Sequence, residues 1–282
     1  MEEADLAALA SSLGLASPAR WTKLRGHRGK SIWRVDCPDG RFVVRILRPD
    51  DDASAEHETR MMTLARGAGL PVARPLATVR MGARPVLLLE WTSGRELRRE
   101  IHNRPWSALR LGELFGEQQA RIHESALEQA LSADWIDCFG PVDAPMRERL
   151  EKVQRQPALL HLDYYPGNLI FASDRLAGIL DWTNARFGDP RADLARTWAL
   201  IRFVFRAGRR HPVRRFGDDL FARGWWRAYE RATGPQDEMA LFRAWALFGL
   251  VREKIQQGSI DATTLNHVQK ELREQAGLPP ND

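Results

Sequence analysis

The chain has 282 residues, of which 44% are hydrophobic and 28% are charged, proportions that exclude a disordered or collagen-like chain. The net charge is +5, but only five of its 42 basic residues are lysines, and acidic residues are interleaved with the arginines, so solvated faces are favoured over a nucleic-acid-binding surface. With no membrane-span-like apolar run, no signal-like start after Met1 and only two cysteines, we expect a cytoplasmic protein without a membrane or nucleic-acid partner.

The first ninety residues are predicted to form a strand-rich unit. Alternation and helical spacing predict four strands and one helix: strands at 33–36, 41–47, 74–79 and 85–90, and the helix at 53–66. The turn signal Asp39-Gly40 joins the first two strands into a hairpin. The strand at 85–90 is nearly all apolar, which is typical of a central position in a sheet.

The rest of the chain is predicted to be mainly helical. Helical periodicity occurs in five segments, 107–125, 190–207, 218–231, 237–256 and 262–275. A short hairpin over 169–180 interrupts them. We therefore expect an α+β chain with an N-terminal unit over 1–90, a hinge over 91–94 and a helical unit over 95–282.

The segment that carries the most specific chemistry is His161-x-Asp163, followed five residues later by Asn168. An aspartate in a polar loop can accept a hydroxyl proton, and the asparagine can bind Mg²⁺ through its amide oxygen; both are parts of phosphoryl-transfer sites. Asp181 follows the hairpin and is the expected second magnesium ligand, because Mg²⁺ prefers carboxylate oxygens. We expect His161 to be structural and to hydrogen-bond backbone.

Three stretches resemble one known family. They are Leu-Gly-x-x-x-Gly-x-x-x-Ala-x-x-His at 111–123, Ile-Leu-Asp-Trp at 179–182 and Gly-Asp-Pro-Arg-Ala-Asp-Leu-Ala at 188–195. With the loop at 161–168, they resemble the aminoglycoside phosphotransferase and choline kinase family over nearly the whole chain. The resemblance implies a two-lobed protein-kinase-like fold, with a small antiparallel sheet in the N-terminal lobe and a larger, mainly helical C-terminal lobe.

The resemblance also implies roles for individual residues. Asp163 is implied to be the catalytic base, with Asn168 and Asp181 binding Mg²⁺. Asp189 is expected to start a helix with Pro190 in its first turn. Asp193 is expected to brace the catalytic loop, or else to be a polar surface residue.

In the N-terminal unit, the resemblance implies a cofactor-binding site for ATP or GTP. Arg45 stands where the family has a lysine that contacts the phosphates, and Glu58 is implied to pair with it. Arginine keeps the charge but is not equivalent to lysine, and the alternative for Arg45 is a solvent-facing strand residue.

Two further segments are implied to contact the nucleotide. Gly26–Ser31 ends in Gly-Lys-Ser, but it lacks the first glycine of a P-loop and the following helix. We expect instead a loop between two strands that covers the phosphates through backbone amides and Ser31. Glu90, Trp91 and Thr92 are the expected hinge that hydrogen-bonds adenine through its backbone, although Trp91 is equally well explained as a packed linker residue.

The expected function is ATP-dependent phosphate transfer to a hydroxyl of a small molecule, such as an antibiotic, an amino alcohol or a sugar-like metabolite, by a monomer or homodimer. The arginines over 200–231 outnumber the acidic residues, which speaks against a polycationic acceptor; four carboxylates keep that alternative open, Glu117, Asp134, Asp137 and Glu253. The alternative function is a kinase-fold protein that binds nucleotide or ligand without phosphate transfer. A protein kinase is disfavoured, because only eight residues separate Asp181 from Asp189.

Overall fold

The computed structural model describes residues 3–16, 20–24, 31–49, 51–125, 133–153, 155–205 and 212–258, and single positions from 265 to 275. The chain divides into two compact units, Met1–Ser93 and Gly94–Asp282. The division falls within the segment predicted as the hinge. None of the helices in these described parts is both long and apolar enough to cross a membrane.

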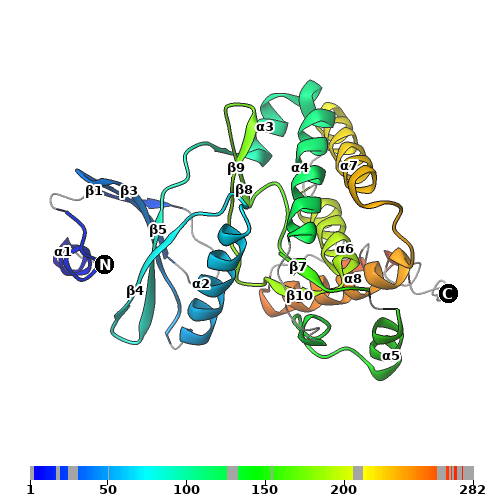
Figure 1. Ribbon diagram of the computed structural model, residues 1–282, viewed down its shortest axis with the longest axis horizontal. Helices are drawn as coiled ribbons and strands as arrows, with labels where there is room; N and C mark the ends of the chain where they lie inside the picture. Colours follow the sequence, from blue (N-terminus) through cyan, green and yellow to red (C-terminus); the bar gives the residue numbers. More distant parts are fainter. Residues whose placement is uncertain are drawn as a thin grey trace. The chain divides into compact units, whose positions relative to one another are not determined.

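The first unit is an antiparallel sheet with one helix on each face (Figure 1). Its elements are α1 (Glu3–Ser12), β1 (Arg20–Leu24), β2 (Ser31–Cys37), β3 (Gly40–Ile46), α2 (Asp52–Gly67), β4 (Pro75–Met81) and β5 (Arg84–Glu90), with the strand order β1-β2-β3-β5-β4. The predicted hairpin, helix and two later strands are confirmed, each to within about two residues.

Alternation along β3 and β5 assigns side chains to the two faces of this sheet. Val44 and Ile46 pack with Leu9 of α1 in one hydrophobic cluster. Arg45, between them in sequence, points to the opposite face and meets Glu58 of α2. Both faces are covered, which explains why β5 is apolar and buried from Pro85 to Leu89.

The second unit is mainly helical. Its helices are α3 (Leu97–Asn103), α4 (Ala108–Glu124), α5 (Ala144–Lys152), α6 (Pro190–Leu200), α7 (Pro212–Thr233) and α8 (Met239–Gln256), with short 3-10 turns at Pro105–Ser107 and Ala133–Trp135. Its short strands are β6 (Arg95–Glu96), β7 (Ala158–Leu160), β8 (Leu169–Ala172), β9 (Arg175–Ile179) and β10 (Arg186–Gly188). The strands form one sheet in the order β6-β8-β9 and a two-stranded pair, β7 with β10.

The predicted helices at 107–125, 218–231 and 237–256 are confirmed as α4, α7 and α8, and the predicted hairpin is β8–β9. The helix predicted over 190–207 is α-helical only to Leu200, and Ile201–Phe205 continues it as a π-helix. The helix predicted over 262–275 lies largely outside the described residues. Figure 1 shows α4 and α7 packed side by side, and the loop at 161–168 leaves β7 beside this pair.

Candidate functional site

The N-terminal unit contains a buried ion pair at the position predicted to bind phosphates. Arg45 Nη1 lies 2.5 Å from Glu58 Oε1. Arg45 is only 7% exposed and Glu58 is fully buried, so the alternative of a solvent-facing arginine is wrong. The expected pairing is therefore present. The attraction within a buried ion pair offsets the desolvation of both charges only when the geometry is good, so this pair restricts the guanidinium to one position.

Ser31 does not lie with this ion pair. It is paired in register with Ile46, and residues directly opposite in an antiparallel pair share a face. Ser31 therefore lies on the α1 face, where it lines a depression together with Lys23, Trp33 and Arg84, whereas Arg45 points to the α2 face. The rest of the predicted phosphate loop, 25–30, lies outside the described residues.

The predicted hinge residues follow β5 directly. The N–H of Glu90 donates to the Arg74 carbonyl (3.0 Å), and the N–H of Trp91 donates to the Arg41 carbonyl (3.2 Å). Both donors are thus used inside the N-terminal unit. The Trp91 ring lies under the Arg34 guanidinium at 5.9 Å. The expected contact of this segment with adenine stays a prediction, and neither Glu90 nor Trp91 has an N–H left for it.

In the second unit, the candidate site is the loop between β7 and β8. His161 is fully buried, its Nε2 lies 3.1 Å from the Leu180 carbonyl, and its Nδ1 accepts from the N–H of Asp163 (3.2 Å). Because a backbone N–H can only donate, Nδ1 is the acceptor and Nε2 carries the proton. The expected structural role of His161 is confirmed.

Three polar side chains meet at one end of the β8–β9 hairpin. Leu169 pairs with Ile179, and the N–H of Leu180 donates to the Asn168 carbonyl (2.8 Å), so Asp181 follows at the same end as Asn168. The Asn168 amide donates to the carbonyl (3.0 Å) and to the carboxylate (2.8 Å) of Asp163. The predicted catalytic and metal-binding residues are therefore brought together.

The environment of Asp163 acts on its protonation. Burial, followed by the negative charge of Asp181, raises the pKa of Asp163 from 3.8 to about 7. The nearby Arg196 guanidinium and the hydrogen bond from Asn168 oppose this shift. A carboxylate in such surroundings is a stronger base than one in water, which suits it to accept a proton near neutral pH.

Asp193 braces this loop, as expected. Its Oδ1 accepts the N–H of Leu162 (2.5 Å), and its Oδ2 accepts from Gln119 Nε2 (2.9 Å) and lies 3.0 Å from His123 Nε2. Burial alone would raise the pKa of Asp193, but the contacts with His123 and Gln119 outweigh it and hold the pKa below its usual range. The buried Asp193 carboxylate of α6 thus connects helix α4 with the loop at 161–168.

Asp189 begins α6, also as expected. Its Oδ1 accepts the N–H of Arg191 (3.0 Å) with Pro190 in the first turn, and its Oδ2 accepts the N–H of Arg155 (2.9 Å). The bond with Arg191 satisfies a backbone donor that a helix start otherwise leaves open, and the bond with Arg155 ties this start to the segment before β7. Asp189 is therefore a structural residue that fixes where α6 starts.

Comparison with known proteins identifies the family. The model of the phosphotransferase enzyme family matches residues 21–143 and 125–236, which together make up more than half of the chain. The chain belongs to this family. A search of the curated proteins finds no match.

The fold of this phosphotransferase-family chain is shared with solved structures. It is similar to aminoglycoside phosphotransferase APH(4)-Ia, with a TM-score of 0.73 and 13% identity over 99% of this chain and 100% of that one. A putative fructosamine-3-kinase from Haemophilus somnus 129PT has a TM-score of 0.64 and 14% identity, covering 95% of each chain. The predicted α+β, two-lobed kinase fold is confirmed.

The loop residues of this family member fit a magnesium ion. Hydrogen bonds use the Asn168 NH₂ group, which leaves its Oδ1 as the atom for a cation. Asp181 lies in the left-handed region (φ 63°), and its Oδ1 accepts from Thr183 Oγ1 (2.9 Å). The described residues contain no cluster of three or more His, Cys, Asp or Glu suited to a metal; a smaller set suffices for Mg²⁺, which usually keeps water and substrate phosphates as ligands.

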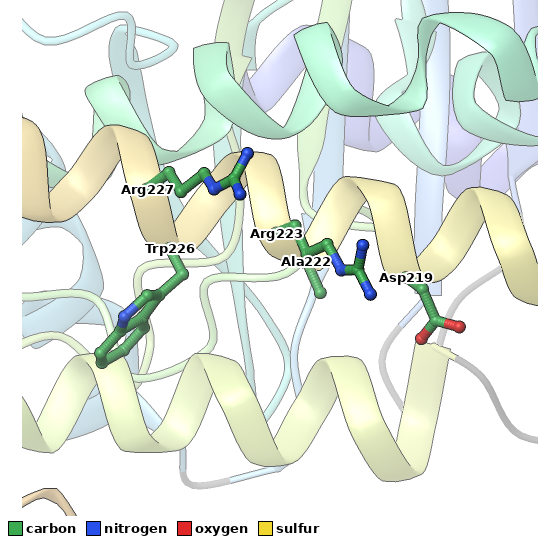
Figure 2. Close-up of a pocket in the computed structure, with 5 residues that line it drawn as sticks. All are labelled: Asp219, Ala222, Arg223, Trp226 and Arg227. Carbon is green, nitrogen blue, oxygen red and sulfur yellow. The ribbon is translucent and has the colours of Figure 1, made fainter.

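A separate depression of about 400 Å³ lies on α7 of this family member (Figure 2). Its lining residues all come from that helix and none from the loop at 161–168: Asp219, Ala222, Arg223, Trp226 and Arg227. Trp226 and Trp198 both lie within 6 Å of the Arg243 guanidinium. This depression is therefore a different surface from the Asp163 cluster.

The structure adds residues to which we assigned no role from the sequence. Leu162 has a φ of 59°, and Arg196 donates from Nε to its carbonyl (3.3 Å). Gln119 and His123 reach Asp193 from α4. Of these, only His123 stands out in the sequence, as the last residue of the family-like stretch at 111–123; a leucine in the left-handed region has no local signature.

Proposed function

We propose that this chain is a small-molecule kinase that transfers the γ-phosphate of ATP or GTP to a hydroxyl group. The observation that carries the proposal is the meeting of Asp163, Asn168 and Asp181 at one hairpin end, in a chain of the phosphotransferase enzyme family. Support for the nucleotide comes from a similar fold, a variant of APH(4)-Ia in a ternary complex with ADP and hygromycin B.

In this proposal, the Asp163 carboxylate accepts the proton of the acceptor hydroxyl as its oxygen attacks the γ-phosphorus, and ADP (or GDP) leaves. Asn168 Oδ1 and the Asp181 carboxylate would hold Mg²⁺, which supplies charge neutralisation to the phosphates when bound. Arg45, fixed by Glu58, would donate to the nucleotide phosphates. Arginine can do so through two donors at once, where lysine is a single point charge.

The ion pairs favour a neutral or anionic acceptor over a polycation. Glu253 is a carboxylate whose charge acts on Asp163, and it forms an ion pair with the buried Arg196. Two other candidate carboxylates are also paired, Glu117 with Arg231 (3.1 Å) and Asp137 with Arg147. A cationic acceptor would have to displace these arginines, and the Arg196 pair is costly to break because it is buried.

The test is ADP or GDP release with Mg²⁺ and ATP or GTP over a panel of hydroxyl compounds. The panel should hold sugars, sugar acids, homoserine, choline, macrolides and aminoglycosides. We expect turnover with a neutral or anionic member, loss of at least about 100-fold in kcat in Asp163→Asn, and little change in nucleotide affinity. Asp174→Asn, at an exposed turn of the same hairpin, is the matched control and should keep full activity.

The competing function is nucleotide or ligand binding without transfer, which the arginine at position 45 favours. Nucleotide binding with no product on any acceptor would support that alternative. Undiminished turnover in Asp163→Asn would overturn the mechanism, and a preference for aminoglycosides would overturn the inference about acceptor charge.

A further inference from the structure

We propose that Arg196, held by Glu253, is a positioning residue that sets the peptide unit directly before Asp163. This inference rests on the proposed function for its kinetic consequence. It goes beyond that function by assigning a role to the Arg196–Glu253 ion pair, which the proposed function leaves unused.

The first observation is the conformation of Leu162. Its φ of 59° places a buried leucine in the left-handed region, which is unfavourable for a residue with a Cβ. Such strain persists only where surrounding contacts over-determine it. The contacts here come from one turn of α6, because Asp193 accepts the N–H of Leu162 and Arg196 donates to its carbonyl.

The second observation is that the Leu162–Asp163 peptide is held at both of its polar atoms. Its carbonyl accepts from Arg196 Nε (3.3 Å), and its N–H donates to His161 Nδ1 (3.2 Å). Asp163 is therefore attached to a peptide plane with no freedom to rotate. The two contacts set the backbone position from which the Asp163 side chain extends, and the hydrogen bond from Asn168 fixes its carboxylate.

The third observation is how Arg196 itself is held. The residue is 1% exposed, its Nη2 pairs with Glu253 Oε2 of α8, and its guanidinium lies 4.1 Å from the centre of the Phe139 ring. Its Nη1 is buried and has no hydrogen-bond partner among the described residues. Burying a guanidinium with one unsatisfied donor contributes little to stability, since replacing a buried ion pair by apolar residues of similar volume is often neutral or stabilising. The geometry points instead to a role in orientation.

Arg196→Lys tests this role, with Arg191→Lys as the matched control. Lysine keeps the charge but cannot reach Glu253 and the Leu162 carbonyl at once, because it lacks the planar fork. Arg191 is on the same helix, equally buried, ion-paired with Asp189 and stacked over Phe242, but it does not touch the loop. We expect kcat to fall about 10- to 100-fold in Arg196→Lys at unchanged nucleotide KM, and to stay near wild type in folded Arg191→Lys.

Amide hydrogen exchange of the segment 158–168 gives a readout that does not need turnover. We expect exchange of the Asp163 amide to rise about tenfold in Arg196→Lys and to be unchanged in Arg191→Lys. Glu253→Gln, which leaves the guanidinium in place with a weaker anchor, should give a smaller change in the same direction and serves if Arg196→Lys does not fold.

The outcomes separate the two proposals. If the wild type is inert on every acceptor but loop exchange rises only in the Arg196 and Glu253 variants, the proposed function fails and the positioning role stands. If loop exchange and kcat change no more in Arg196→Lys and Glu253→Gln than in Arg191→Lys, the positioning role is overturned while the proposed function stands.

Discussion

Asp163, the proposed catalytic base, lies in an environment that costs stability when its carboxylate is ionised. Its carboxylate is confined beside Asp181, and two like charges in partly buried surroundings oppose ionisation. A protein selected for stability alone would separate them or neutralise one. In the proposed reaction, the same repulsion makes Asp163 a better base.

This placement predicts how stability depends on pH in the metal-free protein. The pKa of Asp163 is about 7 when folded and 3.8 when unfolded, so the folded state binds the extra proton. Raising the pH from 4 to 7 therefore lowers the free energy of unfolding, and this loss of stability is complete above pH 7. Asp163→Asn removes this cost, and we expect it to be more stable than wild type by on the order of 4 kcal/mol at pH 8 and by less than about 1 kcal/mol at pH 4.

Urea unfolding in EDTA at several pH values measures this difference. Asp174→Asn makes the same chemical change at an exposed turn of the hairpin, and it should not alter the pH dependence. If Asp163→Asn is more stable than wild type by the same amount at pH 4 and pH 8, the ionised Asp163 carboxylate is not the cause of the difference.

At the scale of elements, glycines set how close α4 and α7 approach. A Cβ at Gly112 would lie 2.1 Å from the Phe221 carbonyl oxygen, and one at Gly116 would lie 2.3 Å from that of Trp225. These are backbone atoms and cannot rotate away. The close approach lets the Trp225 indole donate to Gln119 (2.8 Å), and Gln119 in turn donates to Asp193. The packing of two helices thus supports the loop that carries Asp163.

We therefore expect Gly116→Ala to be strongly destabilising, by about 3 kcal/mol, because the added methyl group forces α4 and α7 apart. Gly67→Ala is the control: Gly67 ends α2, and nothing lies within 4 Å of the Cβ that alanine would add. Alanine there should be neutral or stabilising by up to about 1 kcal/mol. Chemical unfolding of both variants measures the contrast, and a loss below about 0.5 kcal/mol in Gly116→Ala would contradict close packing as the reason for the glycine.

At the scale of the whole molecule, the features predicted correctly are those with local causes. The β8–β9 hairpin follows from its alternation and the start of α6 from Asp189-Pro190. The Arg45–Glu58 pair is implied by the resemblance to the family, and the structure has it. The meeting of Asn168 with Asp181 follows from the hairpin between them, because a tight antiparallel pair brings its two ends together.

The features that the sequence analysis missed depend on residues far apart in the chain. β7 and β10 are three residues each and exist through their pairing with each other. The left-handed Leu162 depends on contacts from α6, about 30 residues later. Ser31 is predicted beside the phosphates from its place in a loop, but the side-chain alternation that puts it on the α1 face is set by the register with β3. Local patterns do not contain these pairings.

Binding of nucleotide and metal should appear as a gain in stability of the whole chain, since a ligand that binds only the folded state shifts unfolding by mass action. At about 100 times the Kd, the gain is about 2.7 kcal/mol, which corresponds to a rise in Tm of roughly 5 °C for a chain of this size. We expect this rise with ATP and Mg²⁺, and a smaller one with ATP in EDTA. In Asp181→Asn, the Mg²⁺-dependent part should be lost without unfolding, because asparagine tolerates the left-handed φ of this position. Thermal scans of wild type, Asp181→Asn and Asp174→Asn measure it; an equal Mg²⁺-dependent rise in all three would show that the carboxylate at 181 does not hold the metal.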